Sequence, residues 1–168
     1  MNLLDSPIIR RTRRNHALEH ATIHLLSTAL PGTSMAGRST PFGFYLYGNV
    51  TEEALMDAAQ QALARLRGGE HRLAIHPGCG TNYLTAGAFS GLAVFTTLNL
   101  GHQRDRWSKL PDALIAATLA LILSQPVGPM LQEKFTTLAE MGDLEIDSVR
   151  QIGTRGKLNV YYVETISS

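Results

Sequence analysis

The sequence has little of what identifies secreted, disulfide-stabilised or nucleic-acid-binding proteins. Cys79 is its single cysteine, which excludes an intrachain disulfide framework and favours a reducing compartment. The formal net charge is only +1, so overall charge gives no reason to expect a nucleic-acid partner. The first nine residues are too short for the apolar region of a signal peptide. We therefore expect any membrane insertion to use an internal segment.

One basic run departs from this even charge balance near the N-terminus, and it consists of Arg10, Arg11, Arg13 and Arg14. In a chain that also carries long apolar segments, such a run is more typical of contact with anionic lipid headgroups, or of a solvated N-terminus, than of nucleic-acid binding. We expect no nucleic-acid partner.

The first half of the chain predicts alternating helices and strands around a loop at residues 32–42. The expected elements are a helix from Arg14 or Asn15 to Leu30, a strand from Phe42 to Tyr47, a helix from Thr51 to Arg67 and a strand from Arg72 to His76. The last three form a β-α-β unit, whose two strands would be parallel.

Two long apolar segments follow, Tyr83–Leu100 and Ala113–Leu131, and neither contains a charged residue. Each is close to the ~20 residues that a helix needs to cross a bilayer. A buried hairpin in a soluble protein is the alternative, since the first segment holds several hydroxyl side chains and the second holds Pro126 and Pro129. We favour membrane spans, because so small a domain could hardly bury two such helices on all sides.

Alternating side chains at residues 144–152 and 158–166 predict a β-hairpin at the C-terminus, which would complete the sheet. The expected fold class is α+β. It combines an N-terminal helix, a small mixed sheet with a β-α-β unit, and an inserted hydrophobic helical hairpin that we expect to be transmembrane. The whole chain, 1–168, is expected to be a single domain with the hairpin inserted at 83–131.

The main chemical signal is the segment HALEH, in which His16, Glu19 and His20 form an H-x-x-E-H pattern. Residues four apart share one face of a helix, so the two imidazoles can bind one zinc ion. Glu19 then occupies the place of the general base in inverted zincin metalloenzymes. His24 extends the stripe by one turn. The alternative is that these side chains form only the solvated edge of an amphipathic helix.

A second signal lies around His76 and Cys79, three residues apart in a Pro-Gly turn. Either side chain could supply the third ligand that a catalytic zinc site needs. Cys79 could instead be a nucleophilic thiolate beside a histidine. It could also be simply a small packed residue in a tight turn. A third segment, Gly43–Gly48, is aromatic and is explained well enough as a core strand.

Together these three segments resemble an uncharacterised bacterial family known only as a domain of unknown function. Its pattern is an HALEHAT helix, a GFYLYG strand and a GE-x-x-LA-[IV]-HP-x-CGTN turn that precedes hydrophobic segments. Here these are His16–Thr22, Gly43–Gly48 and Gly69–Asn82, and the resemblance covers roughly the first 130 residues. It implies no reaction, but it places His16, Glu19, His20, His76 and Cys79 on motif positions.

The function predicted from these observations is a membrane-anchored, zinc-dependent hydrolase, with a peptidase as one form of it. His16 and His20 would bind zinc together with His76 or Cys79, and Glu19 would be the catalytic residue. The alternative is a non-catalytic membrane assembly factor, or a protein that binds a metal or a tetrapyrrole, since histidine also ligates haem iron.

The expected location is the cell membrane with both termini in the cytoplasm, because no signal peptide would export the N-terminal part. The expected partners are membrane lipid and a protein or small molecule that the sequence does not identify. The sequence gives no oligomeric state.

Overall fold

The computed structural model describes Leu4, residues 6–100 and residues 106–167. It is a mixed α and β structure, and it divides into two compact units. The first unit consists of Met1–His76 together with Glu133–Ser168, and the second consists of Pro77–Gln132. The predicted insert at 83–131 lies within the second unit.

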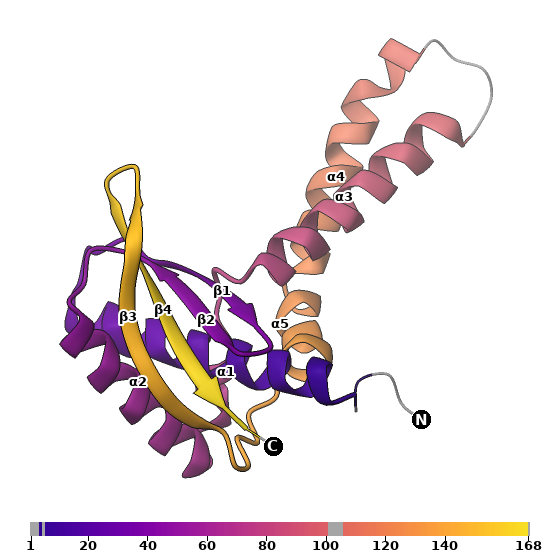
Figure 1. Cartoon of the computed structure of the whole chain (residues 1–168). Helices are drawn as coiled ribbons and strands as arrows, with labels where there is room; N and C mark the ends of the chain where they lie inside the picture. Colours follow the sequence, from indigo (N-terminus) through magenta and orange to yellow (C-terminus); the bar gives the residue numbers. More distant parts are fainter. Residues whose placement is uncertain (1–3, 5, 101–105, 168) are drawn as a thin grey trace. The chain divides into compact units, whose positions relative to one another are not determined.

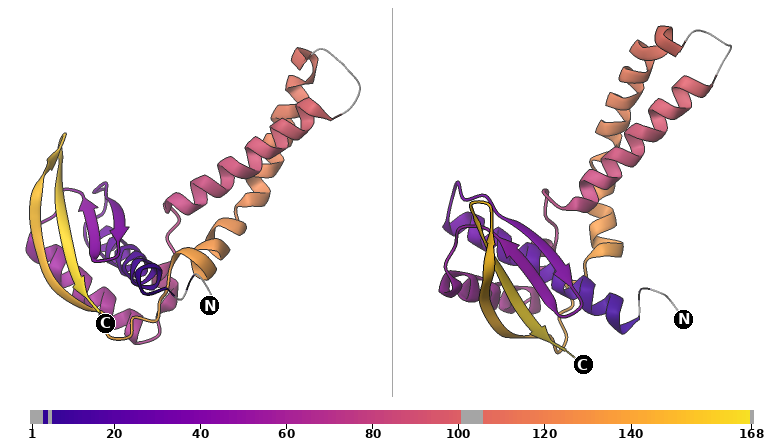
Figure 2. Two further views of the ribbon diagram at one scale, coloured as in Figure 1. Left: turned by 45° about the vertical axis from the view of Figure 1, so that its right-hand side comes forward. Right: turned by 45° about the horizontal axis from the view of Figure 1, so that its top comes forward.

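The first unit is a four-stranded antiparallel sheet with the strand order β1-β2-β4-β3 and two helices on one of its faces (Figures 1 and 2). The predicted C-terminal hairpin is present as the pair β3–β4, and β4 also pairs with β2. The elements are α1 (Pro7–Ala29), β1 (Ala36–Thr40), β2 (Gly43–Tyr47), α2 (Glu52–Arg67), the 3-10 turn η2 (His71–Ala74), β3 (Glu145–Arg155) and β4 (Leu158–Ile166).

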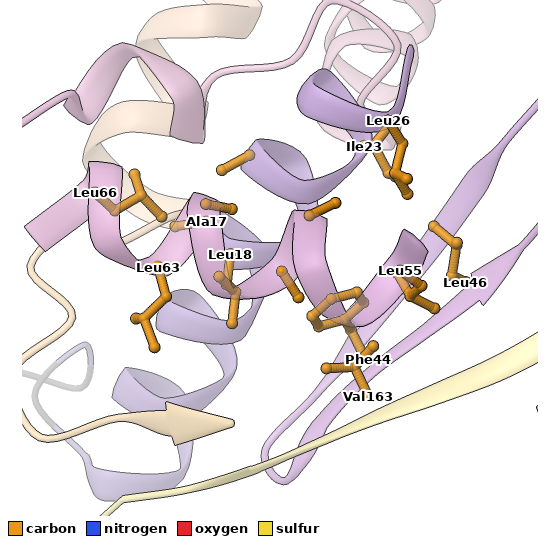
Figure 3. Close-up of a cluster of buried hydrophobic side chains, with 14 of the residues drawn as sticks. Ala17, Leu18, Ile23, Leu26, Phe44, Leu46, Leu55, Leu63, Leu66 and Val163 are labelled. Atoms are coloured by element: carbon orange, nitrogen blue, oxygen red, sulfur yellow. The ribbon is translucent and has the colours of Figure 1, made fainter. Parts of the chain in front are cut away.

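The core lies between the two helices and the sheet (Figure 3). Strand β2 alternates as its sequence predicts, so Phe44 and Leu46 are fully buried while Tyr45 is only half-buried. Alanines such as Ala17 on α1 and Ala59 on α2 are completely buried. Small side chains let two helices approach closely, and this brings the polar residues of α1 near the segments that flank α2.

The predicted mixed sheet and its β-α-β unit are wrong. Every strand pair in the described residues is antiparallel, and the supposed strand at 72–76 is the short turn η2 followed by extended chain. Local hydrogen bonds close the backbone there, from Glu70 N to Arg65 O and from Leu73 N to Glu70 O. A run of only three apolar residues does not distinguish a strand from a buried turn. Periodicity alone therefore predicts the wrong structure for this segment.

The N-terminal helix is also longer than predicted, and part of the predicted loop is a strand. Helix α1 begins at Pro7, which suits the first helical turn, rather than at Arg14 or Asn15. Asn15 is buried, and it links the helix to the sheet by donating to Thr40 O at 3.0 Å and accepting from Thr165 Oγ1 at 2.7 Å. Residues 36–40 form β1, which pairs with β2 across a tight turn.

The second unit is a helical hairpin of α3 (Gly80–Asn99) and α4 (Leu110–Ser124), with the 3-10 turn η3 (Arg106–Lys109) before α4 and the short helix α5 (Val127–Leu131) after it. A π-helical turn, η4 (Gln132–Thr136), begins at its last residue. Asn82 fastens α3 to α5, because its Oδ1 accepts from Gln132 Nε2 at 2.7 Å and its side chain lies against Gly128. Asn82 therefore has a structural role within this unit.

Most large apolar side chains of the hairpin are exposed. In α4 the only buried residues are Ala113 and Ser124. Among the described helices, the segment Trp107–Ser124 alone is long and apolar enough to cross a membrane, and 11% of it is buried. Length and composition thus support one span, but with other bounds than the predicted segment Ala113–Leu131, since α4 ends at Ser124, shortly before Pro126. Helix α3 falls short because glycine and hydroxyl residues dilute its apolar side chains.

Candidate functional site

Four histidines gather in the first unit. His16, His20 and His24 follow one another at single-turn intervals on α1, and His76 comes from the chain just after η2. The ring centroids of His16 and His20 are 4.3 Å apart, those of His20 and His76 are 5.6 Å apart, and those of His24 and His76 are 6.1 Å apart. We call these four residues the histidine cluster.

Two of these rings are oriented by backbone carbonyl groups. His16 Nδ1 lies 2.9 Å from Thr136 O, and His20 Nδ1 lies 2.7 Å from Ala74 O. A carbonyl oxygen can only accept a hydrogen bond, so the Nδ1 atom of each ring must carry the hydrogen. In a neutral ring the lone pair is then on Nε2. Metal-binding histidines are typically oriented in this way, by a hydrogen bond from the second nitrogen.

Glu19 is the single acidic residue of α1, and it is buried. Its Oε2 accepts a hydrogen bond from the hydroxyl group of Ser39 on β1. Its Oε1 lies so close to Gly37 that a Cβ atom there would approach it to 2.2 Å. The glycine and the serine of β1 therefore determine the position of the carboxylate. The sequence does not predict this role, because its pattern at residues 32–42 indicates a loop.

The remaining predicted residues are placed differently. Cys79 belongs to the second unit, where it is buried and directly precedes α3. Its role as a ligand stays a prediction. His24 is exposed, yet its ring lies beside that of His76, so the histidine stripe extends further than the H-x-x-E-H pattern. His71 is exposed at the start of η2, and no ring contact among the described residues joins it to the cluster.

The cluster disfavours positive charge on His76. Burial lowers the pKa of His76, and repulsion from His20 and His24 lowers it further. An imidazole that resists protonation remains a neutral nitrogen donor over a wider pH range. This is the protonation state that a metal ion requires.

This lowered pKa predicts how the metal-free protein responds to acid. Because unfolding restores an ordinary histidine pKa near 6.5, the unfolded chain binds a proton at His76 that the folded chain resists. Stability is therefore expected to fall as the pH drops below about 6.5. Chemical denaturation of chelated protein over a pH series measures this, and His76→Gln should show a weaker decline. Parallel curves for the two proteins would contradict the assignment to His76.

Comparison with known proteins places this chain in a family. Residues 11–149 match the family model described as a domain of unknown function, DUF6391. An uncharacterized protein from Picosynechococcus sp. (strain ATCC 27264 / PCC 7002 / PR-6) is 33% identical over 153 residues, which are 83% of this chain and 71% of that protein. No solved structure matches the chain. The chain belongs to the DUF6391 family.

Proposed function

We propose that this protein is a membrane-anchored metalloprotein that holds zinc in its histidine cluster and uses it for hydrolysis. The observation that carries the proposal is the pair of hydrogen bonds that direct His16 Nδ1 and His20 Nδ1 to backbone carbonyls. They place both lone pairs on the Nε2 atoms, which are the usual donors to zinc. Bonds of this kind restrict the rings before any ion arrives, and so favour binding.

The ligand set would be His16, His20 and His76. A ring nitrogen of His16 lies within 4.8 Å of one of His20, so modest side-chain rotation brings both onto one ion. Cys79 is the candidate for a fourth ligand, since it follows His76 by three residues and the chain keeps their Cα atoms within about 11 Å. Nitrogen and sulfur donors together are typical of zinc.

Hydrolysis would depend on Glu19. Zinc lowers the pKa of water when bound, and a carboxylate near the site would accept the proton. Glu19 is the acidic residue nearest to the histidines along the chain, and it is buried. Ser39 donates to it and thereby restrains it on the side of β1.

The membrane anchor would be the hairpin of α3 and α4. Leu84 and Leu92 on α3 and Leu114 and Leu123 on α4 each expose two thirds or more of their surface. Leaving so many large apolar side chains in water would be unfavourable, and lipid chains would cover them from every side. Exposed apolar side chains lie on both helices of the hairpin. This distribution differs from that of a single apolar face that docks onto one protein partner.

The test is zinc binding to the full chain in detergent, with hydrolysis of a peptide panel as the second readout. Wild type should bind about one zinc ion, and His16→Ala/His20→Ala should bind it more than about 100-fold more weakly, because even indirect partners of a zinc site contribute 10–100-fold. His71→Ala is the matched control and should bind as wild type does. Glu19→Gln should keep zinc and lose hydrolysis.

Equal zinc binding by wild type and the double histidine variant would refute the metal site. Zinc binding without hydrolysis in any preparation would restrict the protein to metal binding. A visible absorption band in the purified protein would point instead to a tetrapyrrole ligand.

A further inference from the structure

A cavity of about 380 Å³ lies in the first unit, apart from the imidazole rings of the histidine cluster. One wall is the segment around η2, and the other is the segment of η4 and the residues after it, 133–140. The lining residues are His71, Arg72, Ala74, Ile75, Glu133, Thr137, Leu138, Ala139 and Glu140. Its size is within the range of about 300–1,000 Å³ that is typical of small-molecule sites.

The wall around η2 is held in place at two points. Glu70 accepts a hydrogen bond from Arg65 Nε at 2.9 Å, which fastens the start of the wall to the end of α2. Ala74 O accepts from His20, which fastens its other end to α1. The wall is therefore fixed although it contains no regular strand.

The opposite wall is held by the basic run of α1. Arg13 Nη2 donates to Lys134 O and to Thr137 O, each at 3.0 Å, and Arg14 Nε donates to Glu140 O at 2.9 Å. These bonds give Arg13 and Arg14 an internal role that neither lipid contact nor solvation explains. The hydrogen bonds to its carbonyl groups hold this irregular segment in one conformation. A ligand would therefore bind without the cost of ordering the segment.

Charged side chains of opposite sign line the two walls. Arg72 stands on the wall around η2, while Glu133 and Glu140 stand on the other. None of these side chains belongs to an ion pair in the described part of the chain. Opposite charges that face a common cavity without pairing across it can each bind one end of a dipolar ligand.

We infer that this cavity binds a small zwitterion, an amino acid or a dipeptide. Its carboxylate would lie toward Arg72 and its ammonium group toward Glu133 and Glu140. The inference rests on the proposed function for its meaning, since such a ligand is what a peptidase acts on or releases. The same backbone segments supply the carbonyls that orient His16 and His20, so the cavity and the histidine cluster share their supports.

The experiment is calorimetric binding of alanyl-alanine to the full chain in detergent with excess chelator. N-acetyl-alanyl-alanine lacks the ammonium group, and alanyl-alanine amide lacks the carboxylate. We expect the dipeptide to bind and each capped form to bind at least about tenfold more weakly, a difference of about 1.4 kcal/mol. Equal binding of all three compounds, or no binding of the dipeptide at millimolar concentration, would overturn the inference.

Two variants locate the site. Arg72→Gln and Glu140→Gln should each weaken dipeptide binding about tenfold, while Lys157→Gln, at the exposed turn between β3 and β4, should not. Glu140 binds Arg14 through its backbone oxygen, so its side chain can be changed without loss of that contact. Unchanged binding in both pocket variants would refute this site.

The chelator separates this inference from the proposed function. If the protein binds the dipeptide but does not bind zinc, the proposed zwitterion site is supported and the proposed zinc site is refuted. If the protein binds zinc but not the dipeptide, the proposed zinc site is supported and the proposed zwitterion site is refuted.

Discussion

Replacing Ile115 and Leu119 of α4 by aspartate is expected to release the protein from membranes. The two side chains expose 61% and 56% of their surface, on a segment of 18 residues that would span about 27 Å as a helix. An aspartate near the centre of a spanning helix disfavours insertion by about 2.5–3.5 kcal/mol. The pair should therefore disfavour it by about 5–7 kcal/mol, enough to abolish stable insertion.

The measurement is the fraction of protein that stays in the membrane pellet after an alkaline carbonate wash. Wild type should remain in the pellet, and the double variant should appear in the supernatant or in aggregates that detergent-free flotation separates from lipid. Phe42→Asp/Ile152→Asp is the matched control, since both residues are large, apolar and at least half exposed but belong to the first unit. The control should remain with the membrane.

Two outcomes would contradict a lipid-covered hairpin. Retention of the α4 variant in the pellet would mean that these side chains do not face lipid. A wild-type protein that is soluble without detergent would mean that another protein surface covers them, since water alone would leave the apolar area exposed.

Sequence periodicity predicted those elements whose side chains alternate or repeat over a sufficient length. Thr51 caps α2 by accepting from Ala54 N, as its position before Glu52 and Glu53 indicates. The hairpin of β3 and β4 has the alternation of a half-buried strand pair. In each case the local signal and the tertiary contacts favour the same structure.

Tertiary contacts decided the elements that the sequence did not predict. Strand β1 has the sequence AGRST, with no apolar alternation, and it exists because β2 offers a pairing edge and α1 offers Asn15 and Glu19. The segment after α2 is apolar for three residues only, and packing against α1 makes it a turn. No local rule encodes either result.

The candidate site was predictable to the extent that helical spacing determines it. The four-residue interval placed His16 beside His20, and chain order alone could not show that His76 would meet His20 and His24. The carbonyls of Ala74 and Thr136, which orient the rings, carry no side-chain signal at all. The basic run is a similar case, because Arg13 and Arg14 bind backbone oxygens more than 120 residues away.

Gly43→Ala is expected to be the most destabilising single substitution of a glycine in the first unit. Gly43 has φ +144°, which L side chains rarely adopt, and a Cβ atom there would lie 2.0 Å from Val163 O. That oxygen belongs to the backbone of β4, so relief requires β2 and β4 to separate. Strain and overlap together should lower the free energy of unfolding by about 2–6 kcal/mol.

Two other glycines serve to separate the contribution of backbone conformation from that of steric overlap. Gly32 has φ +83° but open space around its Cβ position, so Gly32→Ala should lose about 1–2 kcal/mol through conformation alone. Gly153 has neither a positive φ nor a neighbour within 4 Å, and Gly153→Ala should change stability by about 0.5 kcal/mol or less. Chemical denaturation followed by circular dichroism measures all three.

The order of the three variants tests whether the pairing of β2 with β4 supports the site. The turn before Gly43 is bound on both sides, since Thr165 N donates to Phe42 O and Asn15, next to His16 on α1, donates to Thr40 O. Separation of β2 from β4 should therefore also loosen α1 where the histidine cluster begins. If Gly43→Ala were no more destabilising than Gly32→Ala, β4 would have to move away from β2 without a loss of stability. The sheet would then not be the rigid support of α1 that the hydrogen bonds of Asn15 indicate.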